Sequence, residues 1–200
     1  MPSEQPGRLV IISGPSGAGK STVVRRLLDE CSLPLVLSVS ATTRQPRPGE
    51  IDGQHYHFLE NDEFDRLRAA DELLESAEVF GRGHWYGTLR SEVTSGLTKG
   101  NWVILEIDVE GAVSVMQQPD LNPISLFIHP GGLEQLENRL RARQTETEEA
   151  ITRRLEVAVN EMSMMHHYRH EVINDSVDRV TNEICEILKS YEEHSTCSKS

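Results

Sequence analysis

One short stretch constrains the fold more than any other, the glycine-rich turn Gly14-Pro15-Ser16-Gly17-Ala18-Gly19-Lys20-Ser21. An apolar, β-branched run over 9–13 precedes it, and a helical pattern over about 20–31 follows it. The turn fits G-x-x-x-x-G-K-[ST], in which backbone N–H groups and the lysine hold phosphates and the final hydroxyl ligates Mg²⁺. A chance glycine-rich turn would not need this strand–loop–helix setting. We therefore expect the whole turn to bind nucleotide phosphates, with Lys20 catalytic and Ser21 a metal ligand.

Strands and helices alternate along the rest of the chain. Apolar runs predict further strands at 33–40, 56–59, 102–108, 124–128 and 171–175. Helical patterns occur at 61–70 (capped by Asn61 or Asp62), 89–98, 112–118, 133–143, 148–167 and 177–191. Polar segments rich in Gly or Pro predict loops at 41–53 and 81–87. The alternation predicts an α/β fold with a doubly wound, mostly parallel core sheet flanked by helices.

A polar insertion divides this pattern. The stretch from about 40 to 90 is too long for an ordinary connection, so we expect a small lobe over the phosphate site at about 40–88. The core then comprises about 8–39, 89–138 and 168–191 of a single domain over 1–200. The Ser/Thr/Lys-rich tail at 192–200 is expected to be disordered.

Charge and cysteine content exclude some classes of partner. The formal net charge of −12 argues against nucleic-acid binding, which needs a basic face. No apolar run approaches membrane-spanning length, and residues 1–7 lack the apolar core of a signal peptide. Cys31, Cys185 and Cys197 are scattered, which is typical of free thiols in a reducing compartment. We therefore expect a soluble cytoplasmic protein without a membrane or nucleic-acid partner.

Acidic and basic side chains are placed as phosphoryl transfer requires. The apolar run 102–108 ends in Glu106 and Asp108, which could hold Mg²⁺ or its waters or could simply form a polar strand end. Arg44 and Arg47 lie in a proline-rich loop, and further arginines flank an acidic turn at 139–143 and 153–154. Arginines on helices are usually solvated, yet arginines on both sides of a phosphate loop suit charge stabilisation of a transferring phosphoryl group.

From Leu9 to about Leu188 the chain resembles guanylate kinases, which transfer the γ-phosphoryl group of ATP to GMP. The phosphate loop contributes to the resemblance, but the stretch 38–50, Ser-Val-Ser-Ala-Thr-Thr-Arg-Gln-Pro-Arg-Pro-Gly-Glu, is far more specific. Further matching stretches are 52–58, 86–88, 105–111, 139–149 and 173–175. The resemblance implies a P-loop fold with a GMP-binding lobe, a helical lid at about 139–167, and Mg²⁺ acting with ATP.

Site residues follow from the resemblance position by position. The residues implied for GMP are Ser40, Arg44, Arg47, Tyr56, Glu75, Tyr86, Thr88, Glu106 and Asp108. Those implied for ATP are the loop 14–21 with Arg139, Arg143 and Asn174, and those implied for catalysis are Lys20, Arg44, Arg143 and Arg154. Ser21 is the implied Mg²⁺ ligand, with Asp108 as a candidate through water. For Glu75 the local sequence by itself favours a solvent-facing carboxylate.

Two alternatives stay open at this point. A guanylate-kinase-like scaffold domain would bind phosphopeptides without catalysis, and a related P-loop kinase would act on another nucleoside monophosphate. The intact loop and the lid arginines disfavour the first, while Ser40, Glu75 and Thr88 disfavour the second. Glu110 and Gly131-Gly132 depart from the family pattern, and we interpret Glu110 as a tolerated surface change. Both dGMP as a second acceptor and either a monomer or a homo-oligomer are compatible with the sequence.

Overall fold

A computed structural model describes residues 7–78, 83–142 and 147–197. Its main sheet has five parallel strands in the order β2-β7-β1-β8-β9. Their bounds are Arg8–Ser13 for β1, Leu35–Leu37 for β2, Trp102–Glu106 for β7, Ile124–His129 for β8 and His170–Ile173 for β9. Strand β1 lies at the centre, so the loop that follows it opens at the middle of the sheet's carboxyl edge.

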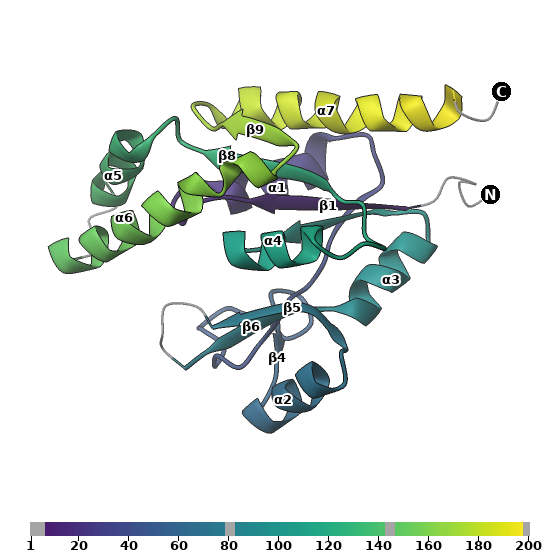
Figure 1. Cartoon of the computed structure of the whole chain (residues 1–200), viewed down its shortest axis with the longest axis horizontal. Helices are drawn as coiled ribbons and strands as arrows, with labels where there is room; N and C mark the ends of the chain where they lie inside the picture. Colours follow the sequence, from purple (N-terminus) through teal and green to yellow (C-terminus); the bar gives the residue numbers. More distant parts are fainter. Residues whose placement is uncertain (1–6, 79–82, 143–146, 198–200) are drawn as a thin grey trace.

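Helices cover both faces of this sheet, as Figure 1 shows. On one face α1 (Lys20–Glu30) and α7 (Val177–Cys197) pack against Val10 and Ile12 of β1. On the other face α3 (Arg90–Thr98) and α4 (Val109–Met116) pack against Leu9 and Ile11. Successive side chains of a strand point to opposite faces, so the continuous apolar run of β1 serves both layers. The predicted doubly wound α/β fold is confirmed.

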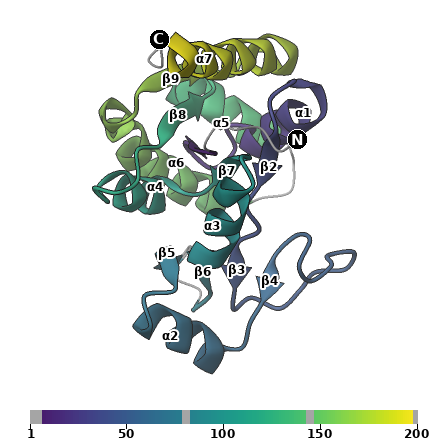
Figure 2. The same cartoon turned by 90° about the vertical axis from the view of Figure 1, so that its right-hand side faces the viewer.

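The insertion forms a separate sheet of four strands, ordered β4-β3-β6-β5, which lies below the main sheet in Figure 2. The strands are β3 (Ala41–Thr42), β4 (His57–Phe58), β5 (Leu73–Glu78) and β6 (Trp85–Leu89), and α2 (Asn61–Ala69) packs beside them. Ala41, Phe64, Leu67 and Leu73 form a small core of their own. This unit, residues 41–89, is called the small lobe below.

A helical pair projects from one end of the main sheet (Figure 1). It consists of α5 (Leu133–Ala142) and α6 (Glu148–Ser163), followed by the short 3₁₀ turn η1 (Met165–His167). Leu136 and Leu140 of α5 pack against Ile151 and Ala158 of α6. This pair, residues 133–163, is called the helical pair below.

Several predicted boundaries are wrong, each for a tertiary reason. Residues 85–87 were expected in a loop, but they begin β6, because Trp85 and Tyr86 pair with β5 across the small lobe. Residues 41–42 pair as β3, although the whole range 41–53 was expected to be loop. The N-cap of α2 is Glu60 without a side-chain bond, so Asn61 and Asp62 lie inside the first turn. Helix α7 extends to Cys197, so residues 192–197 are helical and not disordered; residues 198–200 lie outside the described chain.

The prediction of free thiols is also wrong for two of the cysteines. Cys31, which ends α1, is joined by a disulfide to Cys185 of α7, 154 positions along the chain. The bond forms because the two helices lie side by side on one face of the sheet, a proximity that sequence spacing does not reveal. Among the residues that the structure describes, none of the helices is long and apolar enough to cross a bilayer.

Candidate functional site

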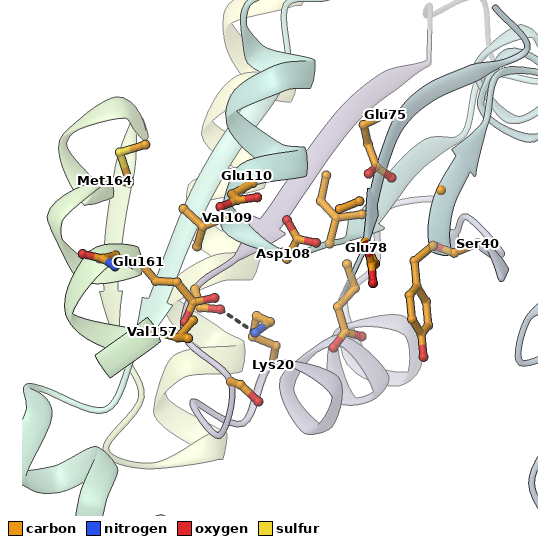
Figure 3. A pocket seen from close by; sticks show the side chains of 18 of the residues that line it. Lys20, Ser40, Glu75, Glu78, Asp108, Val109, Glu110, Val157, Glu161 and Met164 are labelled. Atoms are coloured by element: carbon orange, nitrogen blue, oxygen red, sulfur yellow. Dashed lines mark hydrogen bonds between the residues drawn. The ribbon is translucent and has the colours of Figure 1, made fainter. Parts of the chain in front are cut away.

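A cavity of about 770 Å³ lies between the phosphate loop, the small lobe and α6. Its wall includes the predicted site residues Gly14, Ser16, Lys20, Ser40, Tyr56, Glu75, Tyr86, Glu106, Asp108 and Arg154. In Figure 3 Lys20 and Glu161 lie on one side of this cavity, Glu75 and Ser40 on the other, and Asp108 between them. The structure therefore brings two groups of predicted residues, distant in sequence, to one hollow.

Backbone geometry shapes the phosphate loop. Gly14 has φ +139° and Gly19 has φ +91°, conformations that favour glycine. A Cβ atom at Gly14 would lie 2.0 Å from the Ile128 carbonyl oxygen, and one at Gly19 would lie 2.6 Å from Asn174 Nδ2. Close approach therefore disfavours a side chain at both positions, of the β8 backbone at Gly14 and of the Asn174 amide at Gly19. The loop leads directly into the N-terminus of α1, which favours an anion there.

Lys20 folds back onto this loop. Its Nζ donates to the carbonyl oxygens of Gly14 at 2.6 Å and of Pro15 at 3.2 Å. Burial lowers the pKa of Lys20, while the carboxylates of Glu161, Glu106 and Asp108 oppose that shift. The Lys20 amine thus lies in a desolvated site beside several carboxylates, where an anionic ligand would interact strongly with its charged form.

Three residues predicted for ATP binding or for the lid contact atoms of the phosphate loop. Asn174, which is buried, donates through Nδ2 to the Ala18 carbonyl at 2.7 Å. Arg139 donates to the same carbonyl at 3.2 Å and to the Asn174 carbonyl, and Arg154 Nη1 lies 3.5 Å from Ser16 Oγ. Arg143 lies outside the described residues. Asn174 and Arg139 therefore stabilise the conformation of the loop by donating to its Ala18 carbonyl.

The acid-tipped strand β7 reaches the loop. Ser21 Oγ donates to Glu106 Oε1 at 2.5 Å, while Asp108 Oδ1 accepts the Gly111 N–H at 2.7 Å and so caps α4. The described residues contain no cluster of three or more His, Cys, Asp or Glu side chains able to hold a metal unaided. Mg²⁺ commonly takes one or two protein oxygens with substrate phosphates and waters, and the oxygen donors here fit that pattern.

The predicted phosphate ligands of the small lobe cluster around Arg44. Its guanidinium donates through Nε to the Tyr86 hydroxyl at 3.2 Å and lies 5.4 Å from the centre of the Tyr56 ring. Tyr86 and Tyr56 line the cavity, whereas Arg44 contacts both tyrosines without being among the lining residues. Arg47 is exposed on the loop that leads away from this group.

Glu75 and Thr88 form the far end of the cavity. Only 8% of Glu75 is exposed, and its Oε1 accepts the Thr88 hydroxyl at 2.6 Å across the β5–β6 pair. Burial raises the pKa of Glu75 to about 7, an effect that the bond from Thr88 opposes and the charge of Asp108 strengthens. The interpretation of Glu75 as a solvent-facing carboxylate, favoured by local sequence, is wrong, because pairing with β6 turns the side chain inward.

Residues of α6 that we did not predict also line the cavity. Val157, Glu161 and the C-cap residue Met164 follow Arg154 in steps of three or four, and Asn160 lies next to Glu161, so they share one helix face. Burial raises the pKa of Glu161 to about 7, whereas Lys20 and the Ser16 N–H lower it. The helical spacing from Arg154 was the signal that could have identified them. Glu110, expected at the surface, is exposed but also lines the cavity, as does Glu78.

The two ends of the cavity therefore have different chemistry. The loop end is lined by Gly14 and Ser16 of the loop and by Lys20 and Arg154, basic side chains that suit an anion. The far end offers the buried carboxylate of Glu75 and the hydroxyls of Ser40 and Thr88 to a group rich in N–H donors. Arg44 and the two tyrosines lie beside the far end and suit a second anion.

Comparison with known proteins agrees with this geometry. Residues 6–191 match the family model described as guanylate kinase. A guanylate kinase of Rhodopirellula baltica is 56% identical over 194 residues, covering 97% of this chain and 93% of that protein. One from Caldanaerobacter subterraneus subsp. tengcongensis is 43% identical over 189 residues, covering 94% and 89%.

A solved structure agrees at the level of the fold. The crystal structure of guanylate kinase from Anaplasma phagocytophilum superposes with a TM-score of 0.74 at 32% identity, covering 94% of this chain and 87% of that one. The match to the family model and the near full-length relatives lead to one conclusion: this chain belongs to the guanylate kinase family.

Proposed function

We propose that this protein transfers the γ-phosphoryl group of ATP to GMP, giving ADP and GDP, within the cavity described above. One observation carries the proposal: the phosphate loop and the buried Glu75–Thr88 pair open into the same hollow. A phosphoryl-transfer enzyme must hold donor and acceptor in line, and a shared cavity permits that arrangement.

The far end of the cavity, at Glu75 and Thr88, selects the base of the acceptor nucleotide. Guanine presents N1–H and a 2-amino group on the edge where adenine has neither donor. An ionised Glu75 accepts from both, and Ser40 and Thr88 complete the contact. A buried acceptor left without its donors costs about 1–3 kcal/mol, which disfavours other bases.

Phosphate binding falls to the arginines and tyrosines. Arg44, Arg47, Tyr56 and Tyr86 hold the GMP phosphate, since guanidinium and hydroxyl groups are strong donors to phosphate oxygens. Lys20, Arg139, Arg143 and Arg154 contact the ATP phosphates and the transferring group, and Asn174 lies near the adenine. The lid, residues 139–167, closes over both nucleotides and keeps water from the γ-phosphate.

The metal and the working location are parts of the same proposal. Ser21 would hold Mg²⁺ together with the ATP phosphates, and Glu106 or Asp108 would hold its waters. The ion would neutralise charge that develops on the phosphate oxygens. We place the reaction in the cytoplasm, where ATP and GMP are both available, and cell fractionation tests that placement. The acceptance of dGMP is tested with GMP in the panel below.

A parallel substrate panel tests the proposal. The purified chain is incubated with ATP and Mg²⁺ and with GMP, dGMP, AMP, CMP or UMP, and diphosphate products are separated by chromatography. We expect GDP from GMP at a rate at least about a hundredfold above the products from AMP, CMP and UMP. Equal rates with another base would indicate a different nucleotide kinase, and no product would favour a phosphopeptide-binding scaffold.

A further inference from the structure

Glu50 has no role in the site as described so far, although it ends the family-specific stretch 38–50. Its two carboxylate oxygens accept from Arg44, with Nη1 to Oε2 at 2.9 Å and Nη2 to Oε1 at 2.9 Å. The Oε2 atom also accepts the backbone N–H of Arg47 at 2.7 Å. One carboxylate therefore joins both arginines assigned to the GMP phosphate.

The contacts of Arg44 leave its guanidinium little freedom. Besides Glu50, it donates to the Gln45 carbonyl at 2.7 Å and to the Tyr86 hydroxyl at 3.2 Å. These contacts use four of the five N–H groups of a guanidinium, and the fifth, on Nη2, has no partner within the part of the chain that the structure describes. The side chains of Arg44 and Glu50 are only 11% and 18% exposed.

The same arrangement prepares Tyr86 to donate. Its oxygen accepts from Arg44 Nε, so its own O–H hydrogen can be directed to a ligand. Tyr86 lines the cavity beside Tyr56, whose ring lies under the Arg44 guanidinium. The donors of Arg44 and Tyr86 therefore lie next to each other in the small lobe, and Tyr86 lines the cavity.

Charge and position predict opposite effects for Glu50. The bonds from Arg44 and from the Arg47 backbone lower its pKa to about 2, so it carries a full negative charge at neutral pH. A negative charge beside a phosphate site repels the phosphate, and by charge alone its removal would tighten GMP binding. A mobile arginine, however, loses side-chain entropy when it binds, and a fixed arginine avoids that cost.

We propose that Glu50 is a positioning residue for GMP: it fixes the Arg44 guanidinium and, through the Arg47 backbone, the loop that carries Arg47, so that their remaining donors face the phosphate. Glu50 stays paired with Arg44 when GMP binds. This inference rests on the proposed function, which assigns Arg44 and Arg47 to the GMP phosphate.

The test is the variant Glu50→Gln, which keeps the shape of the side chain and removes its charge. We expect kcat/KM for GMP to fall by about tenfold or more, with KM for ATP within about twofold of wild type. Guanosine, which lacks the phosphate, serves as a competitive inhibitor, and its inhibition constant should also stay within about twofold. A general loss of small-lobe structure would weaken guanosine and GMP alike.

Two further variants accompany it. Glu50→Asp keeps the charge but shortens the side chain by one CH₂, so we expect a smaller decrease in kcat/KM for GMP than in Glu50→Gln. If Glu50→Gln does not fold, Glu50→Asp serves as the test. Asp65→Asn is the matched control, because Asp65 pairs with Arg68 at 2.7 Å on α2 of the same lobe, away from the cavity wall. It should leave both GMP and guanosine binding unchanged.

The outcomes separate the inference from the proposed function. If Glu50→Gln binds GMP as tightly as wild type or more tightly, Glu50 only competes with the phosphate and the inference is overturned. If Glu50→Gln weakens the binding of GMP and of guanosine by the same factor, the inference is overturned as well. Arg44→Lys tests the assignment beneath it: an unchanged ratio of GMP to guanosine affinity in that variant would show that the phosphate site itself is misplaced.

Discussion

The two ends of the cavity are built in different ways. Most of the loop end comes from one contiguous strand–turn–helix, which lines the cavity with Gly14, Ser16 and Lys20, and Arg154 of α6 adds to it. The small-lobe end comes from separate elements, with Tyr56 beside β4, Glu75 on β5 and Tyr86 and Thr88 on β6. A site built mostly on one contiguous segment can be identified from a local sequence motif. A site assembled from several strands depends on how those strands pair.

Burial affects the two ends in opposite directions. It lowers the pKa of Lys20 at the loop end and raises the pKa of Glu75 to about 7 at the other. Desolvation disfavours the charged form in both cases. At the loop end the carboxylates of Glu161, Glu106 and Asp108 oppose this lowering of the Lys20 pKa. At the small-lobe end the charge of Asp108 adds to the effect of burial, and the Glu75 pKa is raised to about 7.

The largest effect should come from the loop end. Lys20→Ala removes the amine that we assign to the phosphates, and we expect kcat to fall by at least about 10²–10³-fold. The fold should be retained, since among the described residues the hydrogen bonds of Lys20 go to loop carbonyls. Steady-state kinetics and circular dichroism measure the two quantities. Lys189→Ala, which removes a lysine from a surface pair with Glu186, is the control. A well-folded Lys20→Ala enzyme with normal turnover would contradict the loop assignment.

The helical pair should contribute next. Arg154→Ala and Arg143→Ala should lower kcat by about 10–100-fold, more than they raise KM for GMP, because their charges meet the transferring group. Arg153→Ala is the matched control, since Arg153 is the exposed neighbour of Arg154 on the same helix. If the variants change only KM for GMP, these arginines belong to the small-lobe end instead.

At the small-lobe end, Glu75→Gln should lower kcat/KM for GMP by at least about tenfold, which corresponds to about 1.4 kcal/mol. The amide keeps an acceptor but can also turn an NH₂ group toward the guanine donors. KM for ATP should change little, because the proposed function assigns ATP to the loop end. Glu72→Gln, at an exposed position just before β5, controls for the loss of one charge. Impaired ATP binding with normal GMP kinetics would mean that Glu75 does not read guanine.

The titration of Glu75 adds a pH dependence. If the ionised Glu75 carboxylate binds guanine, as we propose, KM for GMP should rise by about tenfold between pH 8 and pH 6, given a pKa of about 7. GMP's own phosphate also titrates in this range, so the profile is compared with that of Glu75→Gln, which should lack the Glu75 contribution. Superimposable profiles would argue that Glu75 does not change protonation in the free enzyme.

The same shift affects stability with a definite sign. The pKa of Glu75 is raised from 4.5 to about 7, so the folded state binds this proton more tightly than the unfolded state. Its contribution to the free energy of unfolding is therefore lost as pH rises from about 4.5 to about 7, by up to about 3 kcal/mol. Urea titrations should accordingly find ligand-free Glu75→Gln more stable than wild type at pH 8, with a smaller difference at pH 5.

The smallest effect on activity should come from the disulfide behind the loop end. Cys31→Ser with Cys185→Ser should lower the free energy of unfolding by about 2–4 kcal/mol while changing kcat and KM little, because the bond ties α1 to α7 away from the cavity. Thiol titration of the unreduced, denatured wild type should find one free cysteine of the three. Three free thiols would show that the bond is absent in the purified protein.

The sequence by itself determined the phosphate loop, the alternation of strands and helices and the doubly wound sheet. Each of these depends on short-range chemistry: glycines where the backbone must curl, an apolar run for a buried strand, a 3.6-residue period for a helix. Resemblance to the family then placed the site residues of the small lobe, which local patterns alone did not.

Tertiary structure decided which residues distant in sequence contact one another. Residues 85–87 became strand because β5 offered a partner, and Glu75 became a buried acceptor because that pairing turned it toward Thr88. Cys31 forms a disulfide with Cys185 because α1 and α7 lie on one face of the sheet. Glu161 lines the cavity because α6 lies beside the phosphate loop. These outcomes depend on contacts between residues far apart in the chain, and burial, ionisation and pairing are set by such contacts.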